Sequence, residues 1–273
     1  MIRRPPRSTQ GVSSAASDVY KRQMRLDSHA GGHHSGNWGG LLTNPGVVMA
    51  HAIASMIDRN GKILVEGWRS TQIPNSVRAA IAKLDVGEGE NTPDINPNWG
   101  EPDLTIAERV FASNTFEVRA FETGNPKSPA NAIPPSAVVF GHLRYVVGTD
   151  ISKLMPLLRA HLDKHGFNDI TITSERDMMP ATRLDPDHPW AKWAIKSLSK
   201  TAEDEIAVIP NLGGALPNDV FADLLGLPTI WVPHSYAGCS QHAPNEHILE
   251  SISKSALRPV SYTHLTLPTI LLV

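Results

Sequence analysis

The sequence predicts an α/β fold made of two units that join near residue 178. Apolar residues make up 41% of the 273 residues and charged residues 19%, which is typical of a globular protein. Strand-like segments, in which apolar and polar residues alternate, are interspersed with segments of helical spacing, and Gly, Pro and other turn residues separate them. The second unit has about two strands, too few to bury both faces of a parallel sheet, so it looks like the end of a larger domain.

Two helices are predicted in the first unit. Residues 45–58 place apolar side chains at helical spacing after a proline that suits a first turn, and Gly61 follows the last of them. Residues 151–165 follow Asp150, whose carboxylate can cap a first turn, and Gly166 can end the helix. Each helix has one apolar face, so both can cover the same side of a sheet.

Three strands complete the first unit. Residues 116–123, 137–148 and 170–175 either alternate in polarity or are rich in Val and aromatic residues. The connection from 62 to 110 contains many turn residues and a possible short helix at 75–84. We therefore expect an antiparallel sheet with two helices on one side, and with its other face and edge left for a partner.

The second unit contains the remaining elements. Residues 188–202 are expected to be helical, and residues 205–226 to form a strand, a glycine turn and a helix. The run "LPTIWVP" at 227–233 predicts a strand. A last helix is expected over 244–257, with a proline at its first position and a glutamate in its first turn.

The two ends of the chain differ from the rest. Residues 1–23 are rich in Arg, Ser and Pro, which leaves an organellar transit peptide open but excludes a secretory signal, because no apolar core is present. Residues 260–273 are apolar but too short and too proline-broken to span a bilayer. Both ends resemble translated sequencing-adapter sequence. We therefore expect them to be non-native or disordered and to pack against nothing, with residues 24–259 as the protein proper.

Charge and cysteine content narrow the classes of function. The net charge of -2 gives no indication of nucleic acid as a partner, and no segment predicts a membrane partner. Cys239 is the only cysteine, which excludes an internal disulfide and fits a reducing compartment. We expect a cytoplasmic protein in which this thiol is a small buried side chain rather than a nucleophile.

Two stretches in the first unit contain candidate functional residues. In "GGHHSGNWGG", residues 31–40, glycines around two histidines form a tight loop that can approach a ligand closely, or a surface turn with solvated histidines. In "NAIPPSAVVFGHLRY", residues 131–145, Arg144 lies within an apolar strand. Its guanidinium needs a carboxylate or phosphate partner, which is either a ligand or an internal acid.

Two further candidates lie in the second unit. In "NLGGALPND", residues 211–219, a glycine turn leads into a helix, which either binds an anion or simply connects strand and helix. In "CSQHAPNEH", residues 239–247, His242 follows a strand-like run and precedes a helix. A histidine held in such a turn can be a zinc ligand or a structural residue, and catalytic zinc takes about three protein ligands.

In their order along the chain, these four stretches resemble the di-zinc exopeptidase and amidohydrolase family that includes carnosinase, glutamate carboxypeptidase and aminoacylase. "HSGNWGG" is similar to the start of that family's peptidase dimerisation domain, closest to the carnosinase-like dipeptidases, and "NAIPPSA" with "LRY" to its substrate-clamp strand. "GGALP" and "HAPNE" resemble its last two active-site turns. The resemblance implies a dimerisation (lid) domain at 24–178 and the C-terminal part of an α/β zinc-peptidase catalytic domain at 179–259.

The resemblance also implies roles for individual residues. Arg144 and Asn131 would hold the terminal carboxylate of a substrate, and the backbone N–H groups of Gly213 and Gly214 would lie in the same pocket. His34 would reach across a homodimer and stabilise the oxyanion in the partner's site. The family often has Ser or Thr directly after its two glycines, and alanine stands there in this chain, so one hydroxyl contact to the carboxylate is missing.

The resemblance implies two zinc ions that activate a bridging water and polarise the scissile carbonyl. His242 matches the family's late histidine ligand, whereas the His-x-Asp, the bridging Asp, the Glu-Glu pair and a further acid would precede residue 24. The letters "HLD" at 161–163 are no substitute, because residues two apart on a helix point to different sides. We therefore expect this chain alone to be inactive.

Three functions remain open at this stage. The first is a fragment of a di-zinc metallopeptidase that hydrolyses dipeptides or releases a terminal amino acid. The second is an N-acyl amino acid amidohydrolase of the same family, which would share the carboxylate clamp. The third is a non-catalytic dimerisation or peptide-binding module. A His-x-Asp at a strand end and a Glu-Glu pair upstream would favour an enzyme.

Overall fold

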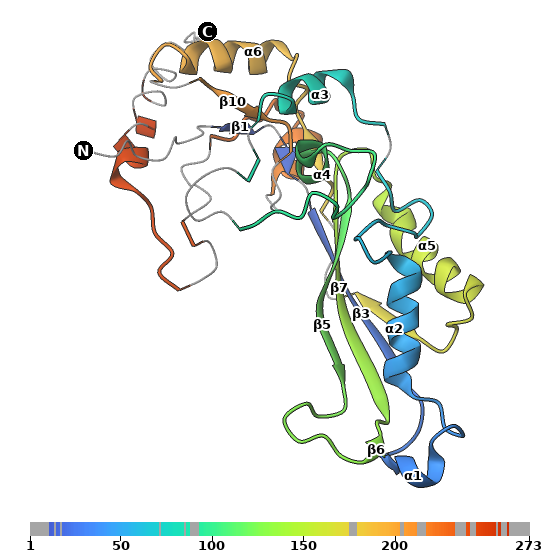
Figure 1. Ribbon diagram of the computed structural model, residues 1–273. Helices are drawn as coiled ribbons and strands as arrows, with labels where there is room; N and C mark the ends of the chain where they lie inside the picture. The colour runs from blue at the N-terminus through green and yellow to red at the C-terminus, as the bar shows by residue number, and fades with distance from the viewer. Residues whose placement is uncertain are drawn as a thin grey trace.

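The computed structural model shows a long sheet with helices on one side and a second group of elements at one end (Figure 1). The structure describes residues 11–13, 15–16, 18–70, 72–84, 86–87, 93–174, 179–202, 205–211, 217–232, 239–240, 244–254, 256–257 and 261. The sheet has four antiparallel strands in the order β5-β7-β3-β8. Their bounds are Asp18–Asp27 for β3, Thr115–Thr123 for β5, Ser136–Tyr145 for β7 and Thr171–Ser174 for β8.

Two helices cover one face of this sheet, as expected. They are α2, Pro45–Met56, and α5, Ile151–Lys164, and both lie on the same side of β3 and β7 (Figure 1). In chain order the unit is β3-α2-β5-β7-α5-β8, the β-α-β-β-α-β arrangement in which each helix connects two strands. The expected antiparallel sheet with two helices is therefore confirmed, with one strand more than the sequence predicted.

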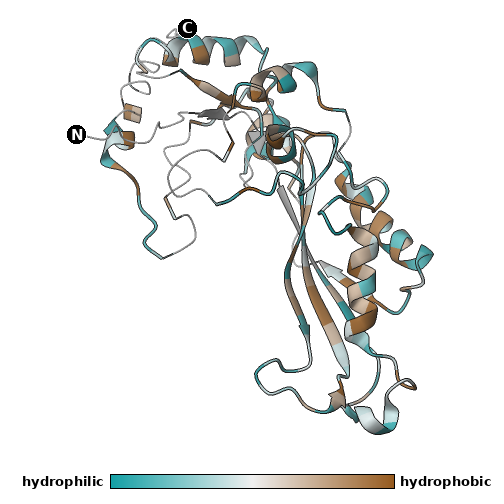
Figure 2. Ribbon diagram, in the orientation of Figure 1, coloured by the Kyte–Doolittle hydropathy of each residue, from teal (hydrophilic) through white to brown (hydrophobic). Residues whose placement is uncertain are grey.

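Alternation along β7 explains which face is buried. Ala137, Val139, Leu143 and Tyr145 are fully buried, whereas the side chains between them are mostly only half-buried. Val139 is paired with Met24 of β3, which is also fully buried. Figure 2 shows the hydrophobic residues along β7 and α2. The other face of the sheet is covered by no helix among the described elements.

Helix α5 packs on the sheet through one row of leucines. Leu154, Leu158 and Leu162, spaced by four residues, have no solvent exposure. The helix begins where the sequence predicts, because the carboxylate of Asp150 accepts a hydrogen bond from the backbone N–H of Ser152. The Leu154 carbonyl also accepts a hydrogen bond from the fully buried indole N–H of Trp68, at 2.9 Å. This bond fixes the long connection after α2 to the core.

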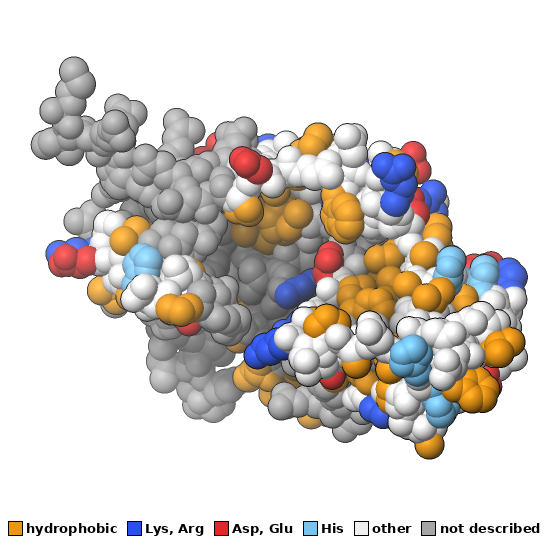
Figure 3. Space-filling view, turned by 60° about the horizontal axis from the view of Figure 1, so that its bottom comes forward, with side chains coloured by type: hydrophobic (Ala, Val, Ile, Leu, Met, Phe, Trp, Pro, Cys, Tyr) orange, Lys and Arg blue, Asp and Glu red, His pale blue; other side chains and the backbone are white. Residues whose placement is uncertain are grey.

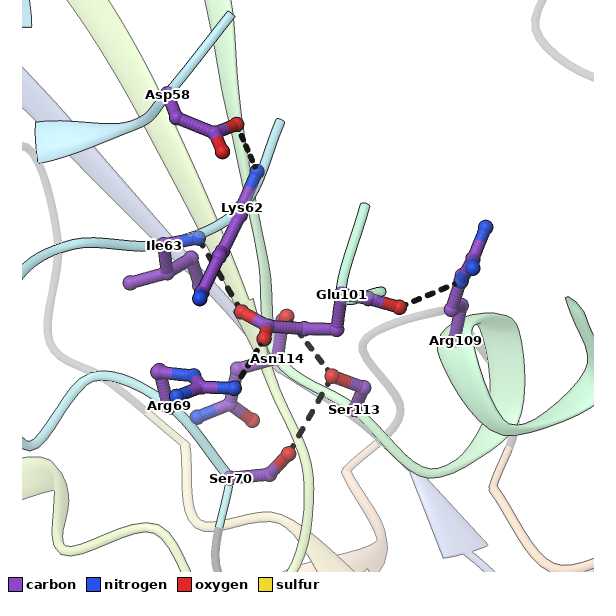
Figure 4. A network of polar contacts seen from close by, with 9 residues as sticks. All are labelled: Asp58, Lys62, Ile63, Arg69, Ser70, Glu101, Arg109, Ser113 and Asn114. Atoms are coloured by element: carbon purple, nitrogen blue, oxygen red, sulfur yellow. Dashed lines mark hydrogen bonds and ion pairs between the residues drawn. The ribbon is translucent and has the colours of Figure 1, made fainter. Parts of the chain in front are cut away.

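The connection from α2 to β5 contains two short helices, α3, Asn75–Ile81, and α4, Ile106–Phe111. The first was expected and the second was not. Figure 4 shows the polar contacts that hold this connection together. The buried Glu101 carboxylate accepts hydrogen bonds from the backbone N–H of Ile63, at 3.2 Å, and from the Arg69 guanidinium, at 2.5 Å. The Arg109 guanidinium donates to the Glu101 carbonyl at 2.8 Å.

The second unit differs from expectation at two places. Helix α6, Pro189–Leu198, strand β10, Ala207–Ile209, and the π-helix η1, Val220–Leu224, lie within their expected ranges. The run 227–233 forms no strand among its described residues, apart from an isolated bridge at Trp231. The last helix begins at residue 250 rather than 244, because a turn with Asn245 in the left-handed region precedes it.

Three short strand pairs complete the described elements. They are β1, Gly11–Ser13, with β10; β2, Ala15–Ala16, with β9, Thr182–Arg183; and β4, His33–His34, with β6, Ala132–Ile133. The expectation that residues 1–23 pack against nothing is therefore wrong for β1, β2 and the first part of β3. Backbone pairing does not require the alternating pattern that residues 1–23 lack. Residues 262–273 lie outside the described part of the chain. None of the described helices has the length and apolar composition of a membrane span.

Candidate functional site

His34 lies in a loop at the far end of the sheet, which we call the tip: β4, β6 and the short helix α1, Ser35–Trp38. Figure 1 shows the tip beyond the ends of β3 and β7. His34 is exposed, and its backbone pairs with Ala132. The backbone N–H of Ser35 donates to the carbonyl of Asn131 at 3.0 Å. The fold therefore places His34 and Asn131 side by side.

The His34 ring has a defined position on the tip. Its Nδ1 accepts a hydrogen bond from the backbone N–H of Gly36 at 3.1 Å, so His34 is the cap of α1. No other hydrogen bond of this ring is formed among the described residues. Histidine side chains and hydrophobic side chains gather on this end of the molecule (Figure 3). Among the hydrophobic ones, Trp38 of the tip and the nearby Leu41 are 45% and 76% exposed, so this end of the molecule has exposed apolar surface.

Arg144 lies at the opposite end of β7 from the tip. It is half-buried and is paired with Thr115, the first residue of β5. Its neighbours Leu143 and Tyr145 point into the core, so its guanidinium lies on the face of the sheet without helices. Glu117 is on the same face two residue pairs further along, and burial raises the pKa of its carboxyl despite the opposing effect of the positive charge of Arg144. Sequence reasoning missed Glu117, because only the pairing of β5 with β7 reveals it.

The structure does not bring Asn131 and Arg144 together within one chain. Arg144 lies eight positions beyond Ser136 on β7, a separation of about 26 Å at about 3.3 Å per residue. Asn131 and His34 lie beyond Ser136 on the far side. A single chain therefore presents two separate groups: His34 with Asn131 at the tip, and Arg144 with Glu117 at the other end. The two groups are too far apart for both to contact one small ligand within a single chain.

The other expected site residues lie outside the described part of the chain. These are Gly213, Gly214 and His242. Their neighbours are described: the buried Asn211 donates a hydrogen bond to the Phe111 carbonyl, and Cys239 is a buried free thiol, as expected. Pro244 and Glu246 are not in a helix, because the following helix begins only at residue 250.

The described residues do not fit a two-metal site. Within the described ranges no three His, Cys, Asp or Glu side chains are grouped so that they could hold a metal ion. The "HLD" letters are used otherwise: the His161 Nε2 is 3.0 Å from the Ser55 carbonyl, and the Asp163 carboxylate accepts from Arg159. The expectation that these residues are no ligand pair is consistent with these contacts.

Comparison with known proteins shows which proteins this chain resembles. The chain is 21% identical to human Beta-Ala-His dipeptidase over 230 residues, which cover 79% of this chain and 44% of the dipeptidase. Its structure is similar to the M20 family metallo-carboxypeptidase Sso-CP2 from Sulfolobus solfataricus, with a TM-score of 0.78, 25% identity and coverage of 93% and 59%. For the dipeptidase Dug1p from Saccharomyces cerevisiae the TM-score is 0.74, with 17% identity and coverage of 93% and 55%.

The chain thus spans about half the length of the relatives it matches. The family model of the M20 peptidase dimerisation domain, described as "Peptidase dimerisation domain", matches residues 21–170, which is more than half of the chain. That range contains the tip, the whole of β7 and both covering helices. The chain therefore belongs to the M20 peptidase family, whose dimerisation domain it contains.

Proposed function

We propose that this chain is part of a zinc-dependent M20 peptidase that hydrolyses dipeptides or releases a terminal amino acid, and that its active site is shared between two copies. The observation that carries the proposal is the separation of His34 from Arg144 along one sheet of a dimerisation domain. Two groups that are about 26 Å or more apart cannot contact one small substrate. A second copy is the simplest source of the missing group.

The edge of the sheet supports this pairing. Among the described strands β5 is hydrogen-bonded only to β7, so its other edge is open. Val118 and Phe121 on this strand are 37% and 43% exposed. Helix α2 has apolar side chains on its outer side as well as its inner side: Val47 is 55% exposed, and Ala50 is exposed too. An edge and a helix with this much apolar surface favour burial against a second copy.

The direction of β5 gives this pairing a consequence for the site. Two-fold symmetry makes two β5 edges run antiparallel, so the Thr123 end of one strand lies near the Thr115 end of the other. The Thr123 end is the one beside the tip, and Thr115 is paired with Arg144. Edge pairing would therefore bring His34 of one copy toward Arg144 of the other.

Within such a site each group has one task. Arg144 would bind the substrate's terminal carboxylate through two parallel hydrogen bonds, the geometry that a guanidinium provides. His34 would donate a hydrogen bond to the oxygen that becomes negative in the transition state. Asn131 would act beside His34, in the partner's site rather than its own. Gly213 and Gly214 would offer backbone N–H groups near the carboxylate, and His242 would be one ligand of two zinc ions.

The direct test uses this chain joined to an upstream segment that supplies the remaining metal ligands. His34→Ala should lower kcat with little change in KM, because an oxyanion contact forms only in the transition state. Arg144→Ala should mainly raise KM, because the carboxylate is present in substrate and transition state alike. Subunit exchange between the two variants should restore about one quarter of the activity, since half of the dimers are mixed and each has one intact site. No recovery despite proven exchange would refute the shared site.

Two alternatives are separated by the same material. Both classes of substrate offer Arg144 the same carboxylate, so this residue does not distinguish a peptidase from an amidohydrolase. A panel of dipeptides and N-acyl amino acids does distinguish them. The other alternative is a non-catalytic dimerisation role for this chain on its own. In that case calorimetric titration of the chain with zinc should show no tight site, and an assay with peptide substrates should show no hydrolysis. Its single cysteine is compatible with a cytoplasmic location.

A further inference from the structure

The position of the His34 ring depends on the residue two places after it. The ring lies against the backbone of Gly36, and the N–H of that residue points at Nδ1 from 3.1 Å. A Cβ atom at position 36 would lie 2.8 Å from the ring's Cε1 and 3.1 Å from Nδ1. Gly36 has no left-handed backbone angle, so conformation does not explain why a glycine is present here. Space for the imidazole ring does.

The direction of this hydrogen bond fixes the proton on the ring. A backbone N–H can only donate, so Nδ1 must offer a lone pair, and the neutral ring then has its proton on Nε2. The Nε2–H points away from Nδ1, and the His34 side chain is exposed. A neutral donor held in one direction is what an oxyanion contact needs, because it costs no reorganisation when the charge develops.

The rest of the tip holds the ring and its donor in place. The N–H of Ser35 donates to the carbonyl of Asn131 at 3.0 Å, and the N–H of Gly39 donates to the carbonyl of Ser35 at 2.8 Å. These bonds anchor the turn on both sides of Gly36. The backbone N–H that faces His34 therefore belongs to a turn that the β4–β6 strand pair supports.

We propose that Gly36 is a positioning residue that fixes His34 as a neutral Nε2–H donor, through its amide and through the space left by its missing side chain. This proposal rests on the proposed role of His34 for its meaning in catalysis. The geometry itself is testable without substrate, so the two can fail separately. If the ring is fixed as described but His34→Ala leaves the joined enzyme fully active, the proposed function fails and the ring geometry stands.

The experiment is nitrogen NMR of the chain with 15N-labelled histidine, in which His34→Gln identifies the resonances of His34. The expected result is a single fixed tautomer, with Nδ1 unprotonated and Nε2 protonated. Gly36→Ala should displace the ring and shift both nitrogens toward the averaged values of a free imidazole. Gly32→Ala is the matched control, because its Cβ would lie no closer than 3.4 Å to Ala132 and 3.6 Å to the Ile133 carbonyl. Averaged values in the unmodified chain, or no change in Gly36→Ala, would overturn the proposal.

Hydrogen exchange at Gly36 provides a second measurement that does not depend on the ring signals. His34→Ala should speed exchange of the Gly36 amide about fivefold or more, the factor expected from the loss of one hydrogen bond. His34→Asn should keep the amide protected, because an asparagine oxygen caps the same N–H of a helix. Equal exchange rates in the unmodified chain and in His34→Ala would show that the Gly36 amide does not bond the ring, and the proposal would be wrong.

Discussion

Replacing Asn114 by alanine tests whether polar contacts, and not only the leucine row, hold the end of β7 in place. Asn114 is 2% exposed and lies where its own segment meets the segment of Trp68 and the turn after β7. Its amide N–H₂ donates to the Trp68 carbonyl at 2.8 Å and to the Thr149 hydroxyl at 3.1 Å. Its amide oxygen accepts from the backbone N–H of Val146 at 2.9 Å. Alanine would leave one buried N–H and one buried carbonyl without these partners.

The expected loss follows from those two groups. A buried polar group that loses its partner costs about 1–3 kcal/mol, so Asn114→Ala should lower the free energy of unfolding by about 2–6 kcal/mol. Urea unfolding followed by tryptophan fluorescence measures the change as a shift of the midpoint. Asn125→Ala is the control, because Asn125 is exposed and, among the described residues, its side chain accepts a hydrogen bond only from the nearby N–H of Lys127. A loss in Asn114→Ala no larger than in the control would refute the reasoning.

Three further predictions concern stability. Burial lowers the pKa of His161, so this residue gains a proton more readily in the unfolded chain than in the folded one. The free energy of unfolding should therefore fall as the pH drops below about 6.5. His161→Gln, which keeps a donor for the Ser55 carbonyl, should reduce this pH dependence in urea unfolding at several pH values. Leu158→Ala should cost about 2–5 kcal/mol in denaturant unfolding, because the side chain has no solvent exposure; a loss below 1 kcal/mol, on the order of a surface change, would contradict its placement in the core. Gly61→Ala should destabilise the fold by on the order of 1–2 kcal/mol and so lower the thermal midpoint by several degrees, because φ is +82° and a Cβ would lie 2.7 Å from the Trp99 ring. An unchanged midpoint would exclude both the backbone strain and the steric clash.

Local signals predicted the helices better than the strands. Asp150 before an apolar period marks α5 at one end and Gly166 at the other, and the structure has both features. Strand β3 gave no such signal, because residues 18–23 are mostly polar and the pattern reduces to Met24 and Leu26. Its position between β7 and β8 is set by pairing with segments more than a hundred residues away. Helix α4 could have been predicted from Thr105 and Glu108, which form a capping box.

The sequence suggests candidate site residues but does not predict how they are grouped in space. His34 and Arg144 are identifiable from the letters around them, and the sequence places Asn131 only thirteen positions before Arg144. Extended chain separates such positions by about 40 Å, whereas a helix would separate them by about 20 Å. Short sequence distance was therefore a poor guide to spatial distance. The role of Gly36 is hidden for another reason, since a glycine in a loop has several possible causes and only the ring beside it identifies this one.

The length of β7 determines how far His34 can reach. Lengthening or shortening a strand by one residue turns every side chain beyond that point to the opposite face, which would move Ala137 and Val139 out of the core. Only changes by two residues keep the buried face, and each such step moves the tip by about 6–7 Å. The paired strand β3 would have to change by the same step, whereas β5 already accommodates one extra residue through a register shift between Val118 and Ala120. The spacing between the tip and Arg144 can thus vary only in discrete increments, and proteins of this architecture should fall into length classes that differ by an even number of residues in β3 and β7.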